Sequence, residues 1–503
     1  MPTLQSLLLS NPKVAARFMT AMPASYWVGA GEKHALELFH TAATKVPAYR
    51  DFLASNHVDH TRVRSIQEFS ELVPVSDKSY FAENTLDRMV VGDITDAHIF
   101  YMSGGTTGDS IIGAGSRATL RAYPPALAAM LDLQWGICHA DTKVLVLNAM
   151  SLGAWIGGTY ASAIFTAASD QHPNIAFAAP GADVERTLDL VESLGPHFDM
   201  ILLISYPTLV KEILHAGLRR GIDWRTRCIK LVVSGERLDL ALRHEILGMI
   251  SSPIDHHAIM NQYGASEMGN PGVETPLAST IIRLATENAA LCRDIFNSDT
   301  PLTLMQSNPV GAFMEIVDGR IVGTVGDYMP VIRYSPKDLG RVFSFDEMNA
   351  ILQGHGIDIT CSLAEDGWDK PVFRWPFLMV GTRADYAVSI YGAKVSPNSV
   401  QDIFAEDQRV RRFMLTTDLD GDYVTLSVHV ELRAGLSPSA DEIQDMRDRY
   451  ARATLERLLE LNFDYRDAFA IHAEAMVPRV FVHACEKGPF EAQQDAFKPQ
   501  TLG

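Results

Sequence analysis

Cysteine is scarce in this sequence of 503 residues, which contains five cysteines. They are widely separated, and no two of them form a Cys-x-x-Cys pair. Proteins held together by disulfides and zinc ribbons both need a more regular cysteine spacing. The sequence therefore indicates neither a disulfide framework nor a zinc ribbon, and we expect a reducing compartment, the cytoplasm.

Positive charge is also in short supply. The chain has 43 Lys and Arg residues against 61 Asp and Glu residues, a formal net charge of −18. Such a surface repels phosphate polymers and anionic lipid heads, so we expect neither nucleic acid nor a membrane surface as a partner. A nucleotide remains compatible, because helix N-termini, backbone N–H groups and Mg²⁺ attract a small anion locally.

Long hydrophobic runs are nearly lacking. The stretch between Lys143 and Asp170 is free of charge and long enough to cross a bilayer, but glycine, serine and threonine dilute it. Residues 144–147 are typical of a buried strand that leads into a glycine turn and a buried helix. The apolar patch Leu4 to Leu9 has no basic region before it, unlike a signal peptide. We expect no membrane span and no export.

The chain is too long for one hydrophobic core, which rarely extends beyond about 250 to 300 residues. Between residues 100 and 270, short apolar runs alternate with helical patterns, which is typical of a mainly parallel sheet. The expected strands lie at 99–102, 144–147, 200–204 and 229–233, and the expected helices at 183–194 and 238–250.

Antiparallel structure is expected further along. Asp318-Gly319 between two apolar runs predicts a hairpin, as does Asp420-Gly421. Ser439 followed by Glu442 predicts the capping box of a long helix. We predict an α/β fold with a large N-terminal domain (1–381), whose mainly parallel sheet adjoins an antiparallel, barrel-like part, and a small mobile α+β domain (382–503).

A glycine-rich segment follows the expected strand at 99–102 and reads Ser103-Gly104-Gly105-Thr106-Thr107-Gly108. Its glycines allow the backbone to approach a phosphate closely, and its threonines add hydroxyl donors. The lysine of a Walker A loop is lacking, which disfavours a P-loop NTPase. The segment is equally compatible with a purely structural turn.

Two further segments carry side chains suited to a nucleotide. Tyr263 offers an aromatic face for a purine, and Glu267 offers a carboxylate for Mg²⁺ on the phosphates. Asp338, after the apolar run 330–334, offers a carboxylate for the two ribose hydroxyls. Taken singly, each also fits a turn with a solvated carboxylate.

The order of these motifs resembles the adenylate-forming superfamily of acyl-CoA synthetases, nonribosomal adenylation domains and luciferases, and most closely its phenylacetate-CoA ligase branch. The segments similar to that branch are Val46-Pro47-Ala48-Tyr49-Arg50, Pro74-Val75-Ser76-Asp77-Lys78, the run from Tyr263 to Val273, and Gly381-Thr382-Arg383-Ala384-Asp385-Tyr386. The resemblance extends from about residue 40 to the C-terminus.

This resemblance implies an enzyme that uses ATP and Mg²⁺ to convert a carboxylic acid, by expectation an aromatic one, into an acyl-adenylate, and that then transfers the acyl group to CoA. The implied nucleotide contacts are the loop Ser103 to Gly108, Gly235, Glu236, Tyr263, Gly264, Ser266, Asp338 and Arg383, with Glu267 as the Mg²⁺ ligand. The implied acyl pocket contains Trp155, Tyr206, Gly264 and Ala265. Asp385 would be the hinge of the small domain, and Gly392 would line the thiol tunnel.

The resemblance also implies a lysine near the C-terminus that assists adenylation. Lys498 and Lys487 are both candidates, and we favour Lys498 because of its position close to the end of the chain. No protein nucleophile is needed, because the carboxylate of the substrate attacks the α-phosphate itself. Thr107, Glu267 and the lysine would act electrostatically.

Alternative readings stay open. The acyl acceptor would be a carrier-protein thiol or an amine in one of them. In another, the chain is a degenerate nucleotide-binding protein, since Asp109 and Lys337 depart from the usual motifs. Asp255-His256-His257 resembles a metal phosphoesterase motif, but its supporting residues are lacking and we favour a partly buried loop. A homodimer is the habit of the family that the motifs resemble.

Overall fold

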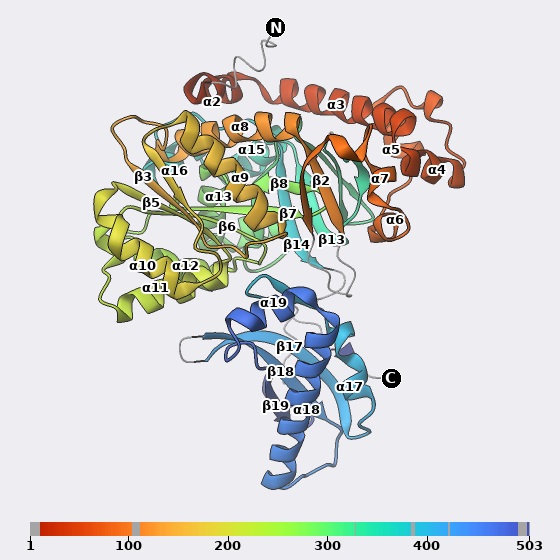
Figure 1. Ribbon diagram of the computed structural model, residues 1–503, viewed down its shortest axis with the longest axis vertical. Helices are drawn as coiled ribbons and strands as arrows, with labels where there is room; N and C mark the ends of the chain where they lie inside the picture. Colours follow the sequence, from red (N-terminus) through yellow and green to blue (C-terminus); the bar gives the residue numbers. More distant parts are fainter. Residues whose placement is uncertain are drawn as a thin grey trace. The chain divides into compact units, whose positions relative to one another are not determined.

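The structure is a computed structural model that describes residues 11–102, 111–326, 328–383, 388–420, 423–490 and 500–501. It consists of two compact units, one built mainly from residues up to Thr382 and the other mainly from Arg383 onward (Figure 1). Among the described helices, none is long and apolar enough to cross a membrane.

A single large sheet forms the centre of the first unit. Its strands are β3 (Val144–Asn148), β4 (Ile175–Ala178), β5 (Met200–Ser205), β6 (Ile229–Ser234), β7 (Ile259–Ala265), β8 (Gly269–Val273), β9 (Thr303–Gln306), β10 (Ala312–Val317), β11 (Arg320–Val325), β12 (Val331–Tyr334), β13 (Asp338–Phe343) and β14 (Phe377–Arg383). The order across the sheet is β10-β11-β13-β14-β9-β8-β7-β6-β5-β3-β4, and β12 pairs with β11.

One half of this sheet is parallel. Strands β4, β3, β5, β6 and β7 run in the same direction, and they alternate along the chain with helices. These helices are α9 (Ile156–Gln171), α10 (Val184–Leu194), α11 (Pro207–Arg219) and α12 (Leu240–Ile250). Asp183 and Asp239 cap α10 and α12 through their side chains, which fixes where these helices begin. The α/β alternation predicted from the sequence is confirmed.

The other half of the sheet is antiparallel and continues the same surface. Strands β10 and β11 form the hairpin expected from Asp318-Gly319, with φ of 51° at Asp318 and 74° at Gly319. Positive φ at both turn residues matches the twist of the two strands. The mixed sheet confirms the predicted fold class, in which a mainly parallel sheet passes into an antiparallel part.

Helices and a separate hairpin surround the sheet (Figure 1). The hairpin consists of β1 (Ala97–Met102) and β2 (Ile112–Ser116). The helices are α2 (Pro12–Ala21), α3 (Ala24–Lys45), α4 (Pro47–Ser55), α5 (Ile66–Leu72), α6 (Lys78–Ala82), α7 (Leu86–Met89), α8 (Arg117–Trp135), α13 (Pro276–Glu287), α14 (Ala289–Phe296), α15 (Phe345–Gly354) and α16 (Ile359–Glu365). Trp375, fully buried, stacks on Phe373 at 4.1 Å and anchors Trp27 of α3 to this core.

The second unit is a small α+β structure. Its strands are β15 (Val388–Ile390), β16 (Ala393–Val395), β17 (Val410–Asp420), β18 (Tyr423–Leu432), β19 (Arg479–His483) and β20 (Gln500–Thr501), and its helices are α17 (Gln401–Ala405), α18 (Ala440–Leu461) and α19 (Phe463–Ile471). Four strands form a sheet in the order β19-β18-β17-β20, and β15 pairs with β16.

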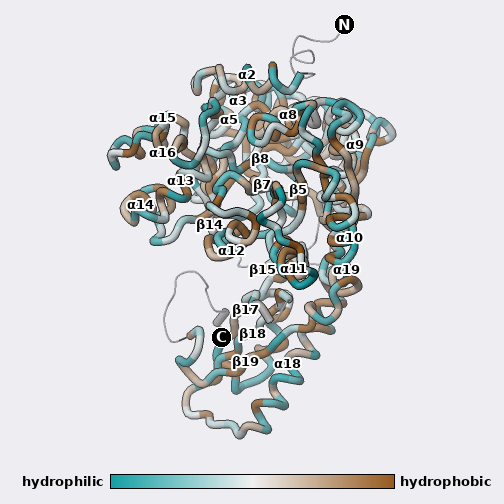
Figure 2. The backbone as a smooth tube through the Cα atoms, turned by 90° about the vertical axis from the view of Figure 1, so that its left-hand side faces the viewer, coloured by the Kyte–Doolittle hydropathy of each residue, from teal (hydrophilic) through white to brown (hydrophobic). Residues whose placement is uncertain are grey.

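Helix α18 shows why this unit is compact. Ser439 and Glu442 form the predicted capping box at its start. Its buried residues are Met446, Tyr450, Thr454 and Leu458, four positions apart, which places them on one face of the helix. Figure 2 shows the matching alternation of hydrophobic and hydrophilic residues along α18.

Candidate functional site

The predicted site residues gather at the carboxyl edge of the parallel strands. Ser205 of β5 pairs with Val233, and Ser234 of β6 pairs with Gln262 of β7. Gly235 and Tyr263 are therefore at one level along this edge, and Tyr206 is one residue short of it. Strand β3 has β4 on one side and β5 on the other, so the strand order reverses between β3 and β5. Ligands of open α/β sheets bind outside such a reversal point.

Tyr206 and Gly235 lie against each other at this edge. Gly235 has a φ of 85°, and a Cβ atom built on it would lie 3.0 Å from the ring of Tyr206. A larger residue at position 235 would push the buried Tyr206 ring out of place. Glu236, the next residue, is half-buried. The strand-end turn thus fixes one wall of the predicted acyl pocket.

The second predicted wall, Trp155, lies beside the end of strand β1. The backbone N–H of Met102 donates to the carbonyl of Ala154 at 2.7 Å, and Met102 forms an isolated bridge with Trp155. Met102 also pairs with Ile112 of β2. The predicted phosphate loop, residues 103–108, including Thr106 and Thr107, lies outside the described residues. Its two flanking strands are thus anchored next to the reversal point of the sheet.

The second and third motifs meet directly. The hydroxyl of Tyr263 donates a 2.7 Å hydrogen bond to Oδ2 of Asp338, the first residue of β13. Both side chains are half-buried, so each has a face open to solvent. The aromatic ring expected to meet a purine and the carboxylate expected to meet a ribose are therefore neighbours.

Gly264 allows two backbones to approach closely. The pairing of β7 with β8 shifts register between Tyr263 and Ala265, where Asn270 and Pro271 of β8 lie opposite the single residue Gly264, so the extra residue belongs to β8. A Cβ atom on Gly264 would lie 2.0 Å from the carbonyl oxygen of Gly269. The N–H of Met268 donates to the carbonyl of Ala265 at 2.9 Å and closes a turn that contains Ser266 and Glu267.

Glu267 is the residue of this turn that fits a metal ion. Its side chain is half-buried and makes no hydrogen bond or ion pair with any residue that the structure describes. Mg²⁺ commonly binds one or two carboxylates and takes its other ligands from phosphates and water. The described residues contain no group of three or more His, Cys, Asp or Glu side chains that would hold a metal unaided. A single carboxylate beside the predicted nucleotide site would fit Mg²⁺ brought in with phosphates.

The structure describes only some of the site residues predicted in or near the small unit. Gly392 forms a two-residue turn with Tyr391 between β15 and β16, with a φ of 83°. Arg383 ends β14, but its side chain lies outside the described residues, as does the whole of Asp385. Lys487 is exposed after β19. Lys498 lies outside the described residues, two positions before β20.

A buried ion pair that sequence reasoning missed supports the third motif. Arg333 of β12, which is 4% exposed, binds Glu315 of β10 through two nitrogens at 2.6 and 3.2 Å. The same guanidinium donates to backbone carbonyls of helix α5 and the residues after it, among them Ser70 at 2.8 Å. The sequence signal for this ion pair was the arginine within the apolar run 330–334, because a charge in a buried strand needs a partner.

The motif Asp255-His256-His257 has a structural role. Nε2 of His257 lies 3.2 Å from Oγ1 of Thr280, whose hydroxyl donates to Asp366 at 2.7 Å. Burial lowers the pKa of His257, as it does that of His256. The loop is partly buried, as expected, and a metal site is not formed there among the described residues.

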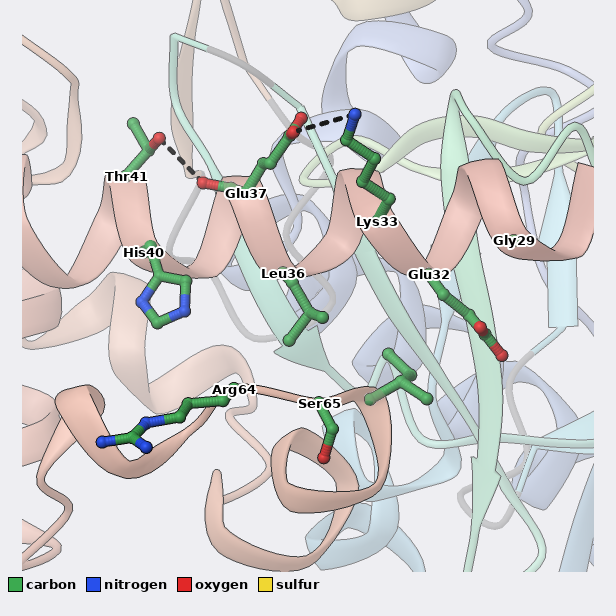
Figure 3. A pocket seen from close by; sticks show the side chains of 10 residues that line it. Gly29, Glu32, Lys33, Leu36, Glu37, His40, Thr41, Arg64 and Ser65 are labelled. Carbon is green, nitrogen blue, oxygen red and sulfur yellow. Dashed lines mark hydrogen bonds and ion pairs between the residues drawn. The ribbon is translucent and has the colours of Figure 1, made fainter.

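An open groove lies away from all these residues. It has a volume of 770 Å³ and runs between helix α3 and residues 64–66 (Figure 3). Its lining includes Glu32, Lys33, Glu37, His40 and Arg64. None of the predicted site residues lines this groove, and its opposite charges are already partly paired, as in the contact of 3.8 Å between Lys33 and Glu37.

Known structures share this architecture. A crystal structure of 2-hydroxyisobutyryl-CoA ligase in complex with 2-HIB-AMP and CoA, in the thioesterification state, matches with a TM-score of 0.62 at 15% identity and covers 93% of this chain and 88% of that chain. The chain shares the fold of this ligase. The same ligase in its postadenylation state with 2-HIB-AMP matches with a TM-score of 0.55 at 14% identity, over 94% of this chain and 90% of that chain. No protein-family model matches the sequence, and no curated protein matches it either.

Proposed function

We propose that this protein activates a carboxylic acid with ATP to form an acyl-adenylate, releases pyrophosphate, and transfers the acyl group to the thiol of CoA. The observation that carries the proposal is the 2.7 Å hydrogen bond between Tyr263 and Asp338 at the carboxyl edge of the sheet. It unites an aromatic face and a ribose-type carboxylate where open α/β sheets bind their ligands. The fold shared with 2-hydroxyisobutyryl-CoA ligase supports the same conclusion.

The first half-reaction requires orientation and charge neutralisation. An oxygen of the substrate carboxylate attacks the α-phosphorus of ATP, the bond from that phosphorus to the bridging oxygen breaks, and pyrophosphate leaves. Tyr263 holds the adenine, Asp338 accepts from the ribose hydroxyls, and Glu267 would hold Mg²⁺. Mg²⁺, when bound, neutralises charge on the phosphate oxygens. The loop from Ser103 to Gly108 and Lys498 add further positive potential.

In the second half-reaction the thiol sulfur attacks the acyl carbonyl carbon and loses its proton to solvent, the bond between that carbon and the phosphate oxygen breaks, and AMP leaves. The lysine has to leave and the thiol has to enter, which a small domain rotating about Asp385 accomplishes. Gly392 lies at a tight turn, a position that suits the passage of a thin pantetheine arm.

We propose an aromatic acid as the substrate. Tyr206 directly follows β5 and Trp155 lies in the connection after β3, so both come from the strands on either side of the reversal point, and an aromatic ring can stack on a flat acyl group. An acyl pocket walled by these two rings would favour a flat acyl group over a branched one.

Pyrophosphate exchange into ATP, measured over a panel of aromatic and aliphatic carboxylic acids, tests the first half-reaction. We expect exchange that depends on an aromatic acid, Mg²⁺ and Asp338. The second half-reaction is tested by offering CoA, a carrier protein or an amine to the isolated acyl-adenylate. If no acid supports exchange while ATP still binds tightly, the protein is a nucleotide-binding protein without this activity.

A further inference from the structure

We propose that segment 74–78 positions the ribose carboxylate, with Asp77 acting through Lys337 on Asp338. The proposal rests on the proposed function, because it takes Asp338 as the ribose ligand. The segment is one of those that resemble the phenylacetate-CoA ligase branch, and the resemblance implies no role for it. Its contacts in the structure indicate one.

The segment is attached to the strand that leads to Asp338. The N–H of Ser76 donates to the carbonyl of Arg333 at 2.9 Å, and the N–H of Ser335 donates to the carbonyl of Ser76 at 2.9 Å. The hydroxyl of the buried Ser76 donates to the carbonyl of Ile332 at 3.2 Å. Ser76 thereby forms an isolated parallel bridge with Tyr334 of β12 and fixes the backbone up to Ser335, three residues before Asp338.

Asp77, which follows Ser76, adds an ion pair to this attachment. Nζ of Lys337 lies 3.5 Å from Oδ2 of Asp77. The other oxygen of Asp77 accepts from the N–H of Ser79 at 3.0 Å and from its hydroxyl at 2.7 Å. These bonds to Ser79, followed by the charge of Lys337, lower the pKa of Asp77, so the carboxylate is ionised at neutral pH. The carboxylate is thus held still and aimed at the lysine.

Lys337 needs such a restraint because of its backbone. Its φ is 69°, in the left-handed region, which costs a residue with a Cβ atom about 1 to 2 kcal/mol. The N–H of Lys337 donates to the hydroxyl of Ser335 at 3.2 Å, and the ion pair with Asp77 holds the side chain. If Lys337 relaxed to negative φ, the following residue, Asp338, would rotate away from Tyr263. The ion pair therefore favours the orientation in which Asp338 meets a ribose.

The test compares ATP with 2′,3′-dideoxy-ATP, which lacks both ribose hydroxyls. Asp77→Asn keeps the hydrogen-bond acceptor for Ser79 and removes the charge that Lys337 meets. We expect Asp77→Asn and Lys337→Ala each to weaken ATP binding about threefold, the effect of an exposed ion pair, and to leave dideoxy-ATP binding unchanged. The double variant should bind ATP no more weakly than either single variant, because both remove the same contact.

Asp93→Asn is the matched control. Asp93 makes the same pair of bonds, to the N–H of Thr95 at 2.8 Å and to its hydroxyl at 2.7 Å, and has no ion pair within the described part of the chain. Asp93→Asn should bind both ATP and dideoxy-ATP as tightly as the wild type does. If Asp77→Asn weakened the binding of ATP and of dideoxy-ATP equally, the role of Asp77 would be merely structural and the inference would be overturned.

Asp338→Ala separates this inference from the proposed function. If Asp338→Ala leaves the preference for ATP over dideoxy-ATP intact, the ribose role of Asp338 itself is wrong. If Asp338→Ala removes the preference and Asp77→Asn retains it, the function stands and only the positioning role of Asp77 fails.

Discussion

The hydroxyl of Tyr263 donates to Oδ2 of Asp338 across 2.7 Å, although the two residues are 75 positions apart in the chain. The bond joins the end of the parallel half of the sheet to the start of β13 in the antiparallel half. A ligand that lies on the Tyr263 ring and bonds Asp338 therefore touches both halves at once.

Tyr263→Phe tests how much this hydrogen bond contributes to nucleotide binding. Phenylalanine keeps the aromatic face but removes the donor that orients Asp338. We expect the KM for ATP to rise about three- to tenfold with kcat nearly unchanged, since a hydrogen bond to a charged group contributes on the order of 1 kcal/mol or more. Steady-state kinetics with ATP as the varied substrate measure it. Tyr423→Phe, at an exposed position of the small unit, is the control. An unchanged KM would mean that Asp338 is held by other contacts.

Gly264→Ala tests the close approach of two backbones. The added Cβ would meet the carbonyl of Gly269 at 2.0 Å, and both strands are fixed by their pairing. We expect a loss of about 1 to 3 kcal/mol in the free energy of unfolding, together with at least about tenfold weaker ATP binding. Gly248→Ala in α12 is the control, because a Cβ there has no neighbour within 4 Å. That substitution should raise stability by up to about 1 kcal/mol. If the two variants behaved alike in denaturation, the close approach of Gly264 to Gly269 would not be the cause.

The sequence was sufficient for features that depend on local chemistry. The capping box at Ser439, the hairpin at Asp318-Gly319 and the alternation of strands 144–147, 200–204 and 229–233 with helices follow from turn residues and periodicity alone. Contacts between distant segments did not follow. Neither the bond from Tyr263 to Asp338 nor the attachment of Ser76 to β12 has a local signal, because register between separate strands is set by tertiary packing.

Glu315→Ala tests the buried pair that supports the third motif. It leaves the guanidinium of Arg333 buried with carbonyl partners but without a counter-charge. We expect it to cost about 3 to 5 kcal/mol in the free energy of unfolding, the usual effect of stranding a buried charge. The double variant Glu315→Leu with Arg333→Met should cost less, because no charge stays in the interior. Chemical denaturation of the wild type, Glu315→Ala and the double variant measures these differences in stability. A double variant less stable than Glu315→Ala would contradict the argument.

The stability of the protein should fall as the pH drops below about 7, in part through His257. This residue is 6% exposed, and burial lowers its pKa although Asp255 and Asp366 act in the opposite direction. Below its unfolded pKa of about 6.5 the unfolded chain takes up a proton that the folded protein refuses until a lower pH. The unfolded state then binds more protons, so acid favours unfolding in that interval. His257→Gln should flatten the dependence of the thermal midpoint on pH between about 7.5 and 5.5, whereas His98→Gln, at an exposed position, should preserve it. If the thermal midpoints of wild type and His257→Gln changed with pH in the same way, the pH dependence would come from other groups.

Lys498→Ala and Lys487→Ala decide which lysine assists adenylation. Lys487 follows Glu486, whose N–H donates to the buried Glu431 at 2.5 Å, so its backbone is held in the turn after β19. Lys498 stands two positions before β20, which pairs with β17 at Phe413 and Arg412. A long cation on the small unit suits a group needed in one half-reaction only. We expect Lys498→Ala to lower acid-dependent pyrophosphate exchange about 100-fold or more, as the loss of one charge-stabilising group does. Transfer from preformed acyl-adenylate to CoA should change by no more than about twofold, because that step begins after the lysine has acted. The reverse pattern would assign the role to Lys487, and full exchange in both variants would remove lysine from the mechanism.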